Sequence, residues 1–302
     1  MLKDTAEANK SVSSDWLEAS GKPHKVAARD LLECFQTLEA DSDRLQQDRA
    51  LYVLISGELR DWLRSTASKL LLVEVRSDRD QYFTAASYAS TILVRTIQRI
   101  GTFPVLYYYC VPRIMDPKNG TLAGGAGMLI SLIAQLLRYL QGRPECDLQF
   151  LGSKKRRFDR VEGDVDELLR IFKKLVKFLP TGQSVYIVID SIWKLQLGTA
   201  DDTQAVVGLF KLINKEDLFI KLFVTDPFSE DIADVLEPQS GRGDSDPAQE
   251  IGGKVINAHV PEHVEPSRHG INTIWLEKEI ADIIEECSSN TSEGGSESDT
   301  AD

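Results

Sequence analysis

Short apolar runs that favour β-strands recur along the chain, and the strongest is Val185 to Ile189, which ends in Asp190. Gly182 precedes this run and helical patterns flank it, so we predict a strand that is buried on both faces. Weaker runs predict further strands at residues 70–75, 103–111, 218–225 and 254–259. Parallel sheets place their ligand crevice at the carboxyl ends of the strands, which makes Asp190 the first candidate site residue.

Between these strands, apolar residues recur at every third or fourth position, which predicts helices. They are expected at residues 25–38, 45–65, 83–100, 128–140, 165–179, 202–214, 229–236 and 274–287. Two boundaries have explicit signals, because Asp164 can cap the helix after it and Gly101 can end the helix before it. Residues 120–127 are expected to form a glycine-rich loop that leads into an apolar helix.

Strands that alternate with helices predict an α/β fold with a mostly parallel five-stranded sheet flanked by helices. We place this domain at residues 45–287. Residues 1–44 precede it as a polar segment and a helix, with the first 24 residues or so expected to be loosely ordered. Residues 288–302 are acidic and rich in serine and glycine, so we expect a disordered tail.

Charge and cysteine usage narrow the classes of partner. The formal net charge is −12, which disfavours nucleic acid and anionic membrane surfaces as partners. No apolar run approaches the roughly 20 residues that span a bilayer. The four cysteines show no CxxC spacing and the first ten residues are polar, so we expect reduced thiols and a cytoplasmic location. The basic run 154–157 favours a solvated loop, with a nuclear-import signal as the alternative.

Several segments together resemble a known family. A helical pattern at 55–69 stands directly before the first strand, the strand at 185–190 ends in an acidic residue, and the strand at 218–225 ends in Thr225. Residues 279–284 belong to a closing helical pattern. This order resembles the nucleotide-binding core of P-loop NTPases, and it is most similar to the NACHT-like STAND ATPases that are abundant in fungi. The strand at 185–190 then matches the Walker B strand, and the strand at 218–225 matches the sensor strand.

The resemblance implies a P-loop NTPase-like three-layer sandwich with a defined order of strands. The strand at 218–225 should lie between those at 70–75 and 185–190. Residues 105–110 should flank the strand at 185–190, and residues 254–258 should form the opposite edge.

The expected phosphate-binding loop departs from the family pattern. A working loop needs the pattern GxxxxGK[ST], in which glycines let backbone N–H groups surround the phosphates and the lysine neutralises them. Here residues 76–83 read Arg-Ser-Asp-Arg-Asp-Gln-Tyr-Phe, with no glycine between Gly57 and Gly101. No lysine occurs between Lys69 and Lys118. The acidic residues that polarise the attacking water are also missing after Asp190.

The resemblance nevertheless assigns roles to a few residues. If a nucleotide binds, the implied ligands of its phosphates are Arg76, Ser77, Arg79 and Thr84. Asp190 would hold Mg²⁺, and Thr225 would take the sensor position. The structural alternatives are that Asp190 caps the turn after its strand, and that Arg76 and Arg79 pair with neighbouring aspartates in a solvated loop.

Two further groups of residues favour a structural role. Gly124 to Gly127 suggests a phosphate loop, but no lysine follows it, so flexible access to a buried helix is the preferred interpretation. His259, His263 and His269 suggest a metal, but Pro261 and Pro266 would break any helix that could align them. A surface loop is therefore favoured over a metal site.

These observations favour a degenerate P-loop NTPase-like domain that is non-catalytic or binds nucleotide weakly, and that acts as an interaction module. Its expected partner is another protein or a second copy of the chain. The cofactor that the resemblance allows is ATP or GTP with Mg²⁺. The alternative is an active Mg²⁺-dependent ATPase or GTPase with an atypical phosphate-binding loop. A third interpretation is an α/β enzyme of another superfamily, with a pocket at the strand ends.

Overall fold

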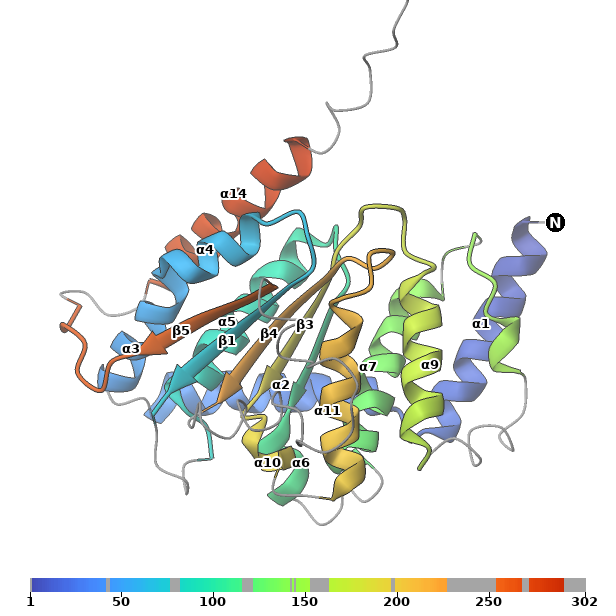
Figure 1. The fold of residues 1–302 in the computed structure, drawn as a ribbon, viewed down its shortest axis with the longest axis horizontal. Helices are drawn as coiled ribbons and strands as arrows, with labels where there is room; N and C mark the ends of the chain where they lie inside the picture. Colours follow the sequence, from blue (N-terminus) through green and yellow to red (C-terminus); the bar gives the residue numbers. More distant parts are fainter. Residues whose placement is uncertain are drawn as a thin grey trace, which may run out of the picture.

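The described part of the computed structural model contains a five-stranded sheet in which every neighbouring pair is parallel (Figure 1). The structure describes residues 2–41, 44–76, 82–115, 122–141, 143, 145–152, 163–196, 199–226, 254–267 and 272–290. The strands are β1 (Lys69–Val75), β2 (Val105–Tyr109), β3 (Val185–Asp190), β4 (Ile220–Asp226) and β5 (Val255–Val260). Their order is β2-β3-β4-β1-β5, which confirms the predicted fold class and the predicted neighbours of every strand.

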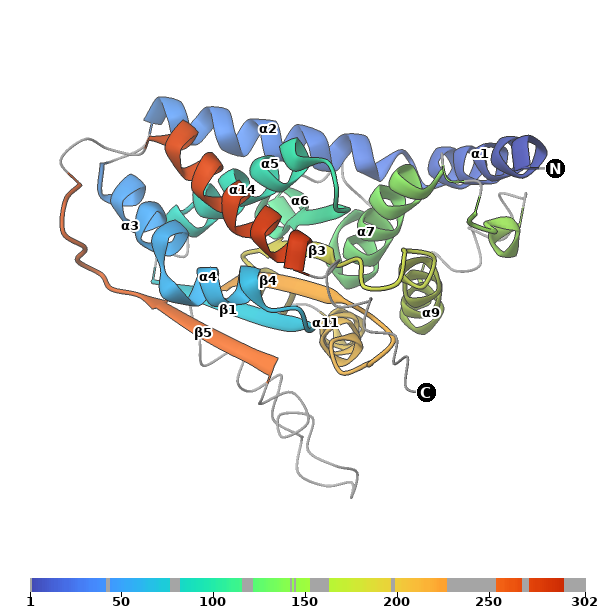
Figure 2. The ribbon, with the colours of Figure 1, turned by 90° about the horizontal axis from the view of Figure 1, so that it is seen from above.

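Helices cover both faces of the sheet, so the architecture has three layers (Figure 2). One face packs against α7 (Gly124–Leu140), α9 (Val165–Val176) and α11 (Ala200–Leu212). The other face packs against α3 (Arg44–Ile55), α4 (Gly57–Arg64), α5 (Ala85–Ile100) and α14 (Thr273–Asn290). Shorter helices follow two of the strands or lie in connections: α6 (Cys110–Met115), η2 (Gln149–Leu151) and α10 (Trp193–Gln196).

The beginning of the chain is helical, so the prediction of a loosely ordered segment up to residue 24 was wrong. Residues 2–19 form α1 (Leu2–Ala19), and α2 (Pro23–Asp41) follows. Val12, Trp16 and Leu17 of α1 are buried in the same apolar cluster as α7. These three residues are too few to give a clear helical period in the sequence. The helix is stabilised by burial of its apolar side chains against the rest of the fold.

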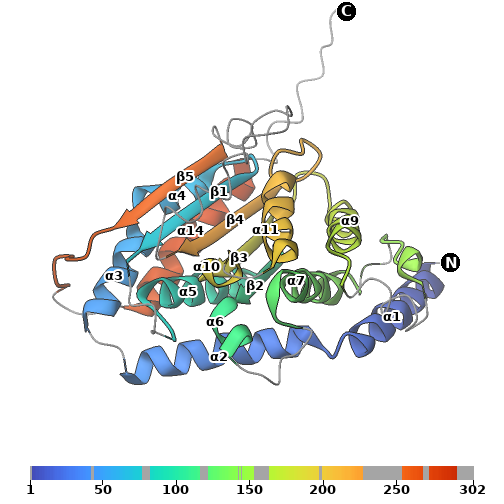
Figure 3. The same ribbon diagram turned by 60° about the horizontal axis from the view of Figure 1, so that its bottom comes forward.

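Helix α2 covers one edge of the sheet. It packs against β2, the strand at that edge, and also against α5 on one face and α7 on the other (Figure 3). Ala27, Leu31 and Cys34 are the apolar residues that α2 buries there. An uncovered edge strand offers unpaired backbone groups to other chains, and α2 blocks that pairing. The predicted boundary of the domain at residue 45 stays a prediction.

Local signals explain most of the remaining differences from the predicted elements. The helix predicted at 45–65 is two helices, because Ser56 is an N-cap whose Oγ accepts the Leu59 N–H at 3.1 Å. The strand predicted at 103–111 is shorter, since Cys110 begins α6. Helix α9 ends at Val176 and not at residue 179, whereas its predicted cap at Asp164 is confirmed. Residues 288–290 belong to α14. The helix predicted at 229–236 and the basic run lie outside the described residues.

Candidate functional site

The carboxyl ends of β3 and β4 meet the first turn of α5 around a buried carboxylate. Asp190 Oδ1 accepts a hydrogen bond from Thr225 Oγ1 at 2.7 Å. Asp190 Oδ2 accepts from Ser87 Oγ at 2.8 Å and from Ser191 Oγ at 3.2 Å. Both carboxylate oxygens therefore have hydroxyl donors from this chain, which come from three separate parts of the sequence.

Asp190 is shielded from solvent. Its side chain is 1 % exposed, and burial raises the pKa of its carboxyl above the ordinary value, although the hydrogen bonds from Thr225, Ser87 and Ser191 oppose the rise. Ser191 has a positive φ of 59°, which is unusual for a residue other than glycine. Its N–H donates to Thr225 Oγ1 at 2.8 Å, which holds this turn in place. The network therefore fixes the backbone just after β3.

The first turn of α5 is the position at which a P-loop protein would bind phosphate, and side chains of this chain occupy its N–H groups. Thr84 and Ser87 form a capping box: the Ser87 N–H donates to Thr84 Oγ1 at 3.3 Å, and the Thr84 N–H donates to Ser87 Oγ at 3.1 Å. The Ala85 N–H donates to Gln46 Oε1 of α3 at 3.0 Å. The N–H groups of residues 84, 85 and 87 are thus already used within the fold.

Helix α3 also holds the residue that follows β1. Arg49 Nη2 donates to the carbonyl oxygen of Arg76 at 2.5 Å, and the Arg49 side chain is buried. The Arg76 side chain is largely exposed and forms an ion pair with Glu262, with Arg76 Nη1 and Glu262 Oε1 3.1 Å apart. A second, longer contact joins Arg76 to Glu74. The guanidinium of Arg76 therefore faces carboxylates beside β5.

The structure brings together some of the predicted site residues. Asp190 and Thr225 are in direct contact, and Thr84 joins them through Ser87, because Thr84 Oγ1 and Ser87 Oγ are 3.3 Å apart. Arg76 is paired elsewhere, and residues 77 and 79 lie outside the described residues. Sequence reasoning missed Ser87, Ser191 and Gln46. The signal that could have indicated Ser87 was its place three residues after a threonine at a helix start.

Gly124, Gly125 and Gly127 belong to α7 and not to a loop, which corrects the prediction for residues 124–127, while residues 120 and 121 lie outside the described residues. Helix α7 begins at Gly124, and Asp202 Oδ1 accepts the Gly125 N–H. A Cβ atom on Gly127 would lie 2.3 Å from the carbonyl carbon of Leu122. Gly127 therefore permits a close backbone approach, and a carboxylate of the same chain already occupies the start of the helix.

The histidines do not gather into a metal site among the described residues. His259 Nδ1 lies 3.2 Å from Glu74 Oε2, and His263 is on the exposed segment after β5, while residue 269 is outside the described ranges. No group of three or more histidine, cysteine, aspartate or glutamate side chains with a suitable arrangement occurs in the described part of the chain.

Replacement of Asp190 by asparagine is expected to leave the unfolding free energy at pH 7 within about 1 kcal/mol of the wild-type value. The amide oxygen can accept from Thr225, and the amide nitrogen can donate to the hydroxyl of Ser87 or Ser191. Asp190→Ala, which leaves the hydroxyls without their acceptor, should cost about 1–3 kcal/mol. Urea unfolding measures both values.

The difference in unfolding free energy between the wild type and Asp190→Asn should depend on pH. Because burial raises the pKa of Asp190, the folded protein binds this proton more tightly than the unfolded chain does. The unfolding free energy of the wild type, taken relative to Asp190→Asn, should therefore be highest at low pH and fall as pH rises through the folded-state pKa. A difference that rises with pH would show that the ionised carboxylate is the form that the fold prefers.

Comparisons with known proteins add no relative: no family model, no curated protein and no solved structure matches the chain. Within the described part of the chain, none of the helices has the length and apolar character needed to cross a bilayer.

Proposed function

We propose that this chain is a degenerate P-loop NTPase-like domain of the NACHT or STAND type, which acts as a non-catalytic interaction module. The observation that supports this proposal is the occupied start of α5. Gln46 accepts the Ala85 N–H, and Thr84 accepts the Ser87 N–H. P-loop proteins bind phosphates with N–H groups of the loop after the first strand and of the first turn of the helix that follows it.

A polyphosphate would have to displace these internal hydrogen bonds before it could bind. The segment after β1 also supplies no lysine to neutralise it, because none lies between Lys69 and Lys118, and no glycine between Gly57 and Gly101 to surround it. Charge-assisted hydrogen bonds contribute about 1.5–3 kcal/mol each, so the loss of two of them weakens binding on the order of a hundredfold or more. The sheet order expected from the resemblance is present, whereas the sequence between Lys69 and Gly101 lacks the glycines and the lysine of the family's phosphate-binding loop.

The interaction part of the proposal draws on exposed apolar side chains of α2, α3 and α14. At the start of α14, Ile274 is 79 % exposed and Trp275 is 49 % exposed. Leu32 of α2, together with Tyr52 and Ile55 of α3, is also exposed. Exposed apolar groups of this size are frequent at protein-binding surfaces. We infer that a protein partner or a second copy of the chain binds through these helices.

Isothermal titration calorimetry tests the loss of nucleotide binding. Wild-type protein is titrated with Mg²⁺–ATP and with Mg²⁺–GTP, and we expect no saturable heat, which corresponds to a dissociation constant above about 1 mM. Asp190→Ala serves as the matched control and should give the same flat titration. A micromolar dissociation constant for the wild type would rule the proposal out.

The second candidate function is an active Mg²⁺-dependent ATPase or GTPase. The cluster of Asp190, Ser87 and Thr225 favours it, because P-loop NTPases hold Mg²⁺ with a hydroxyl from the start of the helix and an acidic residue at the end of the Walker B strand. This function requires that Mg²⁺ reach a buried carboxylate whose oxygens already accept hydrogen bonds from three hydroxyl groups. It is supported if nucleotide binds in the micromolar range and Asp190→Ala weakens that binding.

A further inference from the structure

A cavity of about 620 Å³ lies at the end of the sheet where the strands begin, opposite the end that carries Asp190. The turns before β1, β2 and β3 meet there, and α14 closes one side. Its lining residues are Leu63, Ser65, Thr66, Thr102, Phe103, Pro180, Thr181, Gly182, Gln183, Ser184, Tyr186, Phe219 and Ile284. The volume falls within the range of roughly 300–1,000 Å³ that is typical of sites for small molecules.

The cavity offers no unpaired charge to a ligand. None of its described lining residues is charged, although charged residues make up 27 % of the chain. Two pairs of charged side chains close to the lining residues in the sequence are in ion pairs: Arg64 Nη2 lies 3.6 Å from Glu286 Oε2, and Lys177 Nζ lies 2.5 Å from Asp217 Oδ2. The nearby ammonium of Lys221 donates to the carbonyl oxygens of Trp62 and Ser65, and Lys221 is itself buried and does not line the cavity. A charged ligand would therefore lose its hydration without direct contact to a counter-charge, so the site favours an uncharged one.

Aromatic side chains form much of the apolar wall. Phe103 and Tyr186 meet edge to face with ring centroids 5.5 Å apart, and Phe219 lies at the start of β4. Serine and threonine also line the cavity, notably Thr102, which is adjacent to Phe103, and Ser184, two residues before Tyr186. An aromatic body with one or two hydrogen-bonding groups matches such a wall, because flat rings pack against aromatic side chains while hydroxyls fix their orientation.

Internal hydrogen bonds hold the walls of the cavity in place without a ligand. Gln183 Nε2 donates to the carbonyl oxygen of Thr102 at 2.7 Å and to the hydroxyl of Tyr139 at 3.0 Å, which joins two of the turns. The buried Lys221 Nζ donates to the carbonyl oxygens of Trp62, at 2.7 Å, and Ser65, which fixes the end of α4. A preformed site does not lose affinity to the ordering of its walls.

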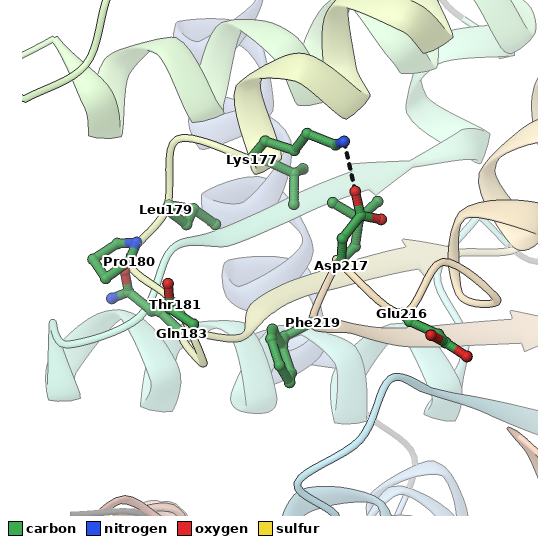
Figure 4. A pocket seen from close by; sticks show the side chains of 10 residues that line it. Lys177, Leu179, Pro180, Thr181, Gln183, Glu216, Asp217 and Phe219 are labelled. Carbon is green, nitrogen blue, oxygen red and sulfur yellow. Dashed lines mark ion pairs between the residues drawn. The ribbon is translucent and has the colours of Figure 1, made fainter.

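A second cavity of about 460 Å³ adjoins the first (Figure 4). The two share Pro180, Thr181, Gln183 and Phe219. In Figure 4 the side chains of Lys177 and Asp217 point toward one another along one side of this second cavity. The polar end of a ligand that extends from the first cavity can therefore reach hydrogen-bonding groups, while its aromatic part stays among the rings.

We propose that the cavity at this end of the sheet is a binding site for a small uncharged aromatic molecule that carries one or two hydrogen-bonding groups. The site shares no residue with the cluster around Asp190, so the proposal does not depend on whether nucleotide binds. It assigns the chain a ligand in addition to its protein partner.

Two fluorescent probes with the same aromatic skeleton test the proposal in the full chain. N-phenyl-1-naphthylamine is neutral, and 8-anilinonaphthalene-1-sulfonate adds a sulfonate. We expect the neutral probe to give a saturable increase in fluorescence with one site per chain, and to bind at least about tenfold more tightly than the anionic probe. Absence of saturable binding, or equal affinity for the two probes, would overturn the proposal.

Variants locate the binding site of the neutral probe. Ser184→Phe fills the cavity from the turn before β3, and Thr66→Trp covers its mouth from an exposed position; each should weaken binding at least about tenfold. Trp275→Ser alters the exposed apolar surface of α14 and should leave the affinity unchanged. If Ser184→Phe does not fold, as circular dichroism would show, Thr66→Trp decides. Binding that falls with Trp275→Ser but not with the filling variants contradicts the assignment.

Discussion

Replacement of Asp30 by valine is expected to lower the unfolding free energy at pH 7 by about 3–5 kcal/mol. Asp30 of α2 forms an ion pair with Arg113 of α6, in which Asp30 Oδ2 and Arg113 Nε are 2.6 Å apart. The side chains are 1 % and 0 % exposed, respectively. Loss of the carboxylate leaves a guanidinium in the interior, and a guanidinium stays charged in proteins.

The double variant separates the value of the pair from the cost of breaking it. Asp30→Val combined with Arg113→Met replaces both charges with apolar groups, and we expect it to recover the wild-type stability or exceed it by about 1–4 kcal/mol. Urea unfolding of the four proteins gives the double-mutant cycle. Burial raises the pKa of Asp30 to about 6 in the folded protein. Arg113→Met alone should therefore cost less at acidic pH than at pH 7, because the stranded carboxylate can take up a proton. Additive effects of the two single changes would show that the charges do not depend on one another.

Trp62→Ala is expected to lower the unfolding free energy by about 3–5 kcal/mol. Trp62 of α4 is 0 % exposed, and its ring meets the rings of Tyr186 and Phe223 edge to face, with centroids 5.7 and 6.0 Å apart. Its Nε1–H donates to the carbonyl oxygen of Lys69 at 3.1 Å. Truncation removes these contacts and leaves a cavity between α4 and the sheet.

Trp62→Phe is the matched control for this position. It retains one ring against Tyr186 and Phe223 but loses the hydrogen bond to Lys69, so a smaller cost of about 1–3 kcal/mol is expected. Chemical denaturation of both variants measures the two losses. If Trp62→Ala costs no more than Trp62→Phe, the aromatic packing seen here does not contribute as argued.

The strands and their order were accessible from the sequence for different reasons. Buried parallel strands have continuous apolar runs, so each of the five could be found from local pattern, with Val185 to Asp190 the clearest. Their order came from the resemblance to P-loop NTPases, and the structure has the same order. The family assignment itself stays a prediction. Helix α1 was missed because its few apolar residues gain their stability from distant partners.

The sequence predicts only the part of the candidate site that lies at the ends of the strands. Asp190 ends β3 and Thr225 is the second-last residue of the neighbouring β4, so their proximity follows from the order of the sheet. Ser87 lies 103 positions from Asp190, and Gln46 lies 39 positions from Ala85. Such contacts depend on how α3 and α5 pack, which a local pattern does not encode. The hydrogen bond from the Ala85 N–H at the start of α5 to Gln46 of α3 could therefore be found only from the three-dimensional structure.

The measurement that tests the central claim most directly is the amide NMR signal of Ala85 in ¹⁵N-labelled protein during titration with Mg²⁺–ATP. The account predicts that the Ala85 and Ser87 signals do not shift at millimolar nucleotide, because Gln46 and Thr84 hold these N–H groups. Gln46→Ala, which releases the Ala85 N–H, shows how large a shift the loss of that hydrogen bond produces. Saturable shifts of both signals in the wild-type protein would contradict the claim that its own side chains occupy the phosphate position.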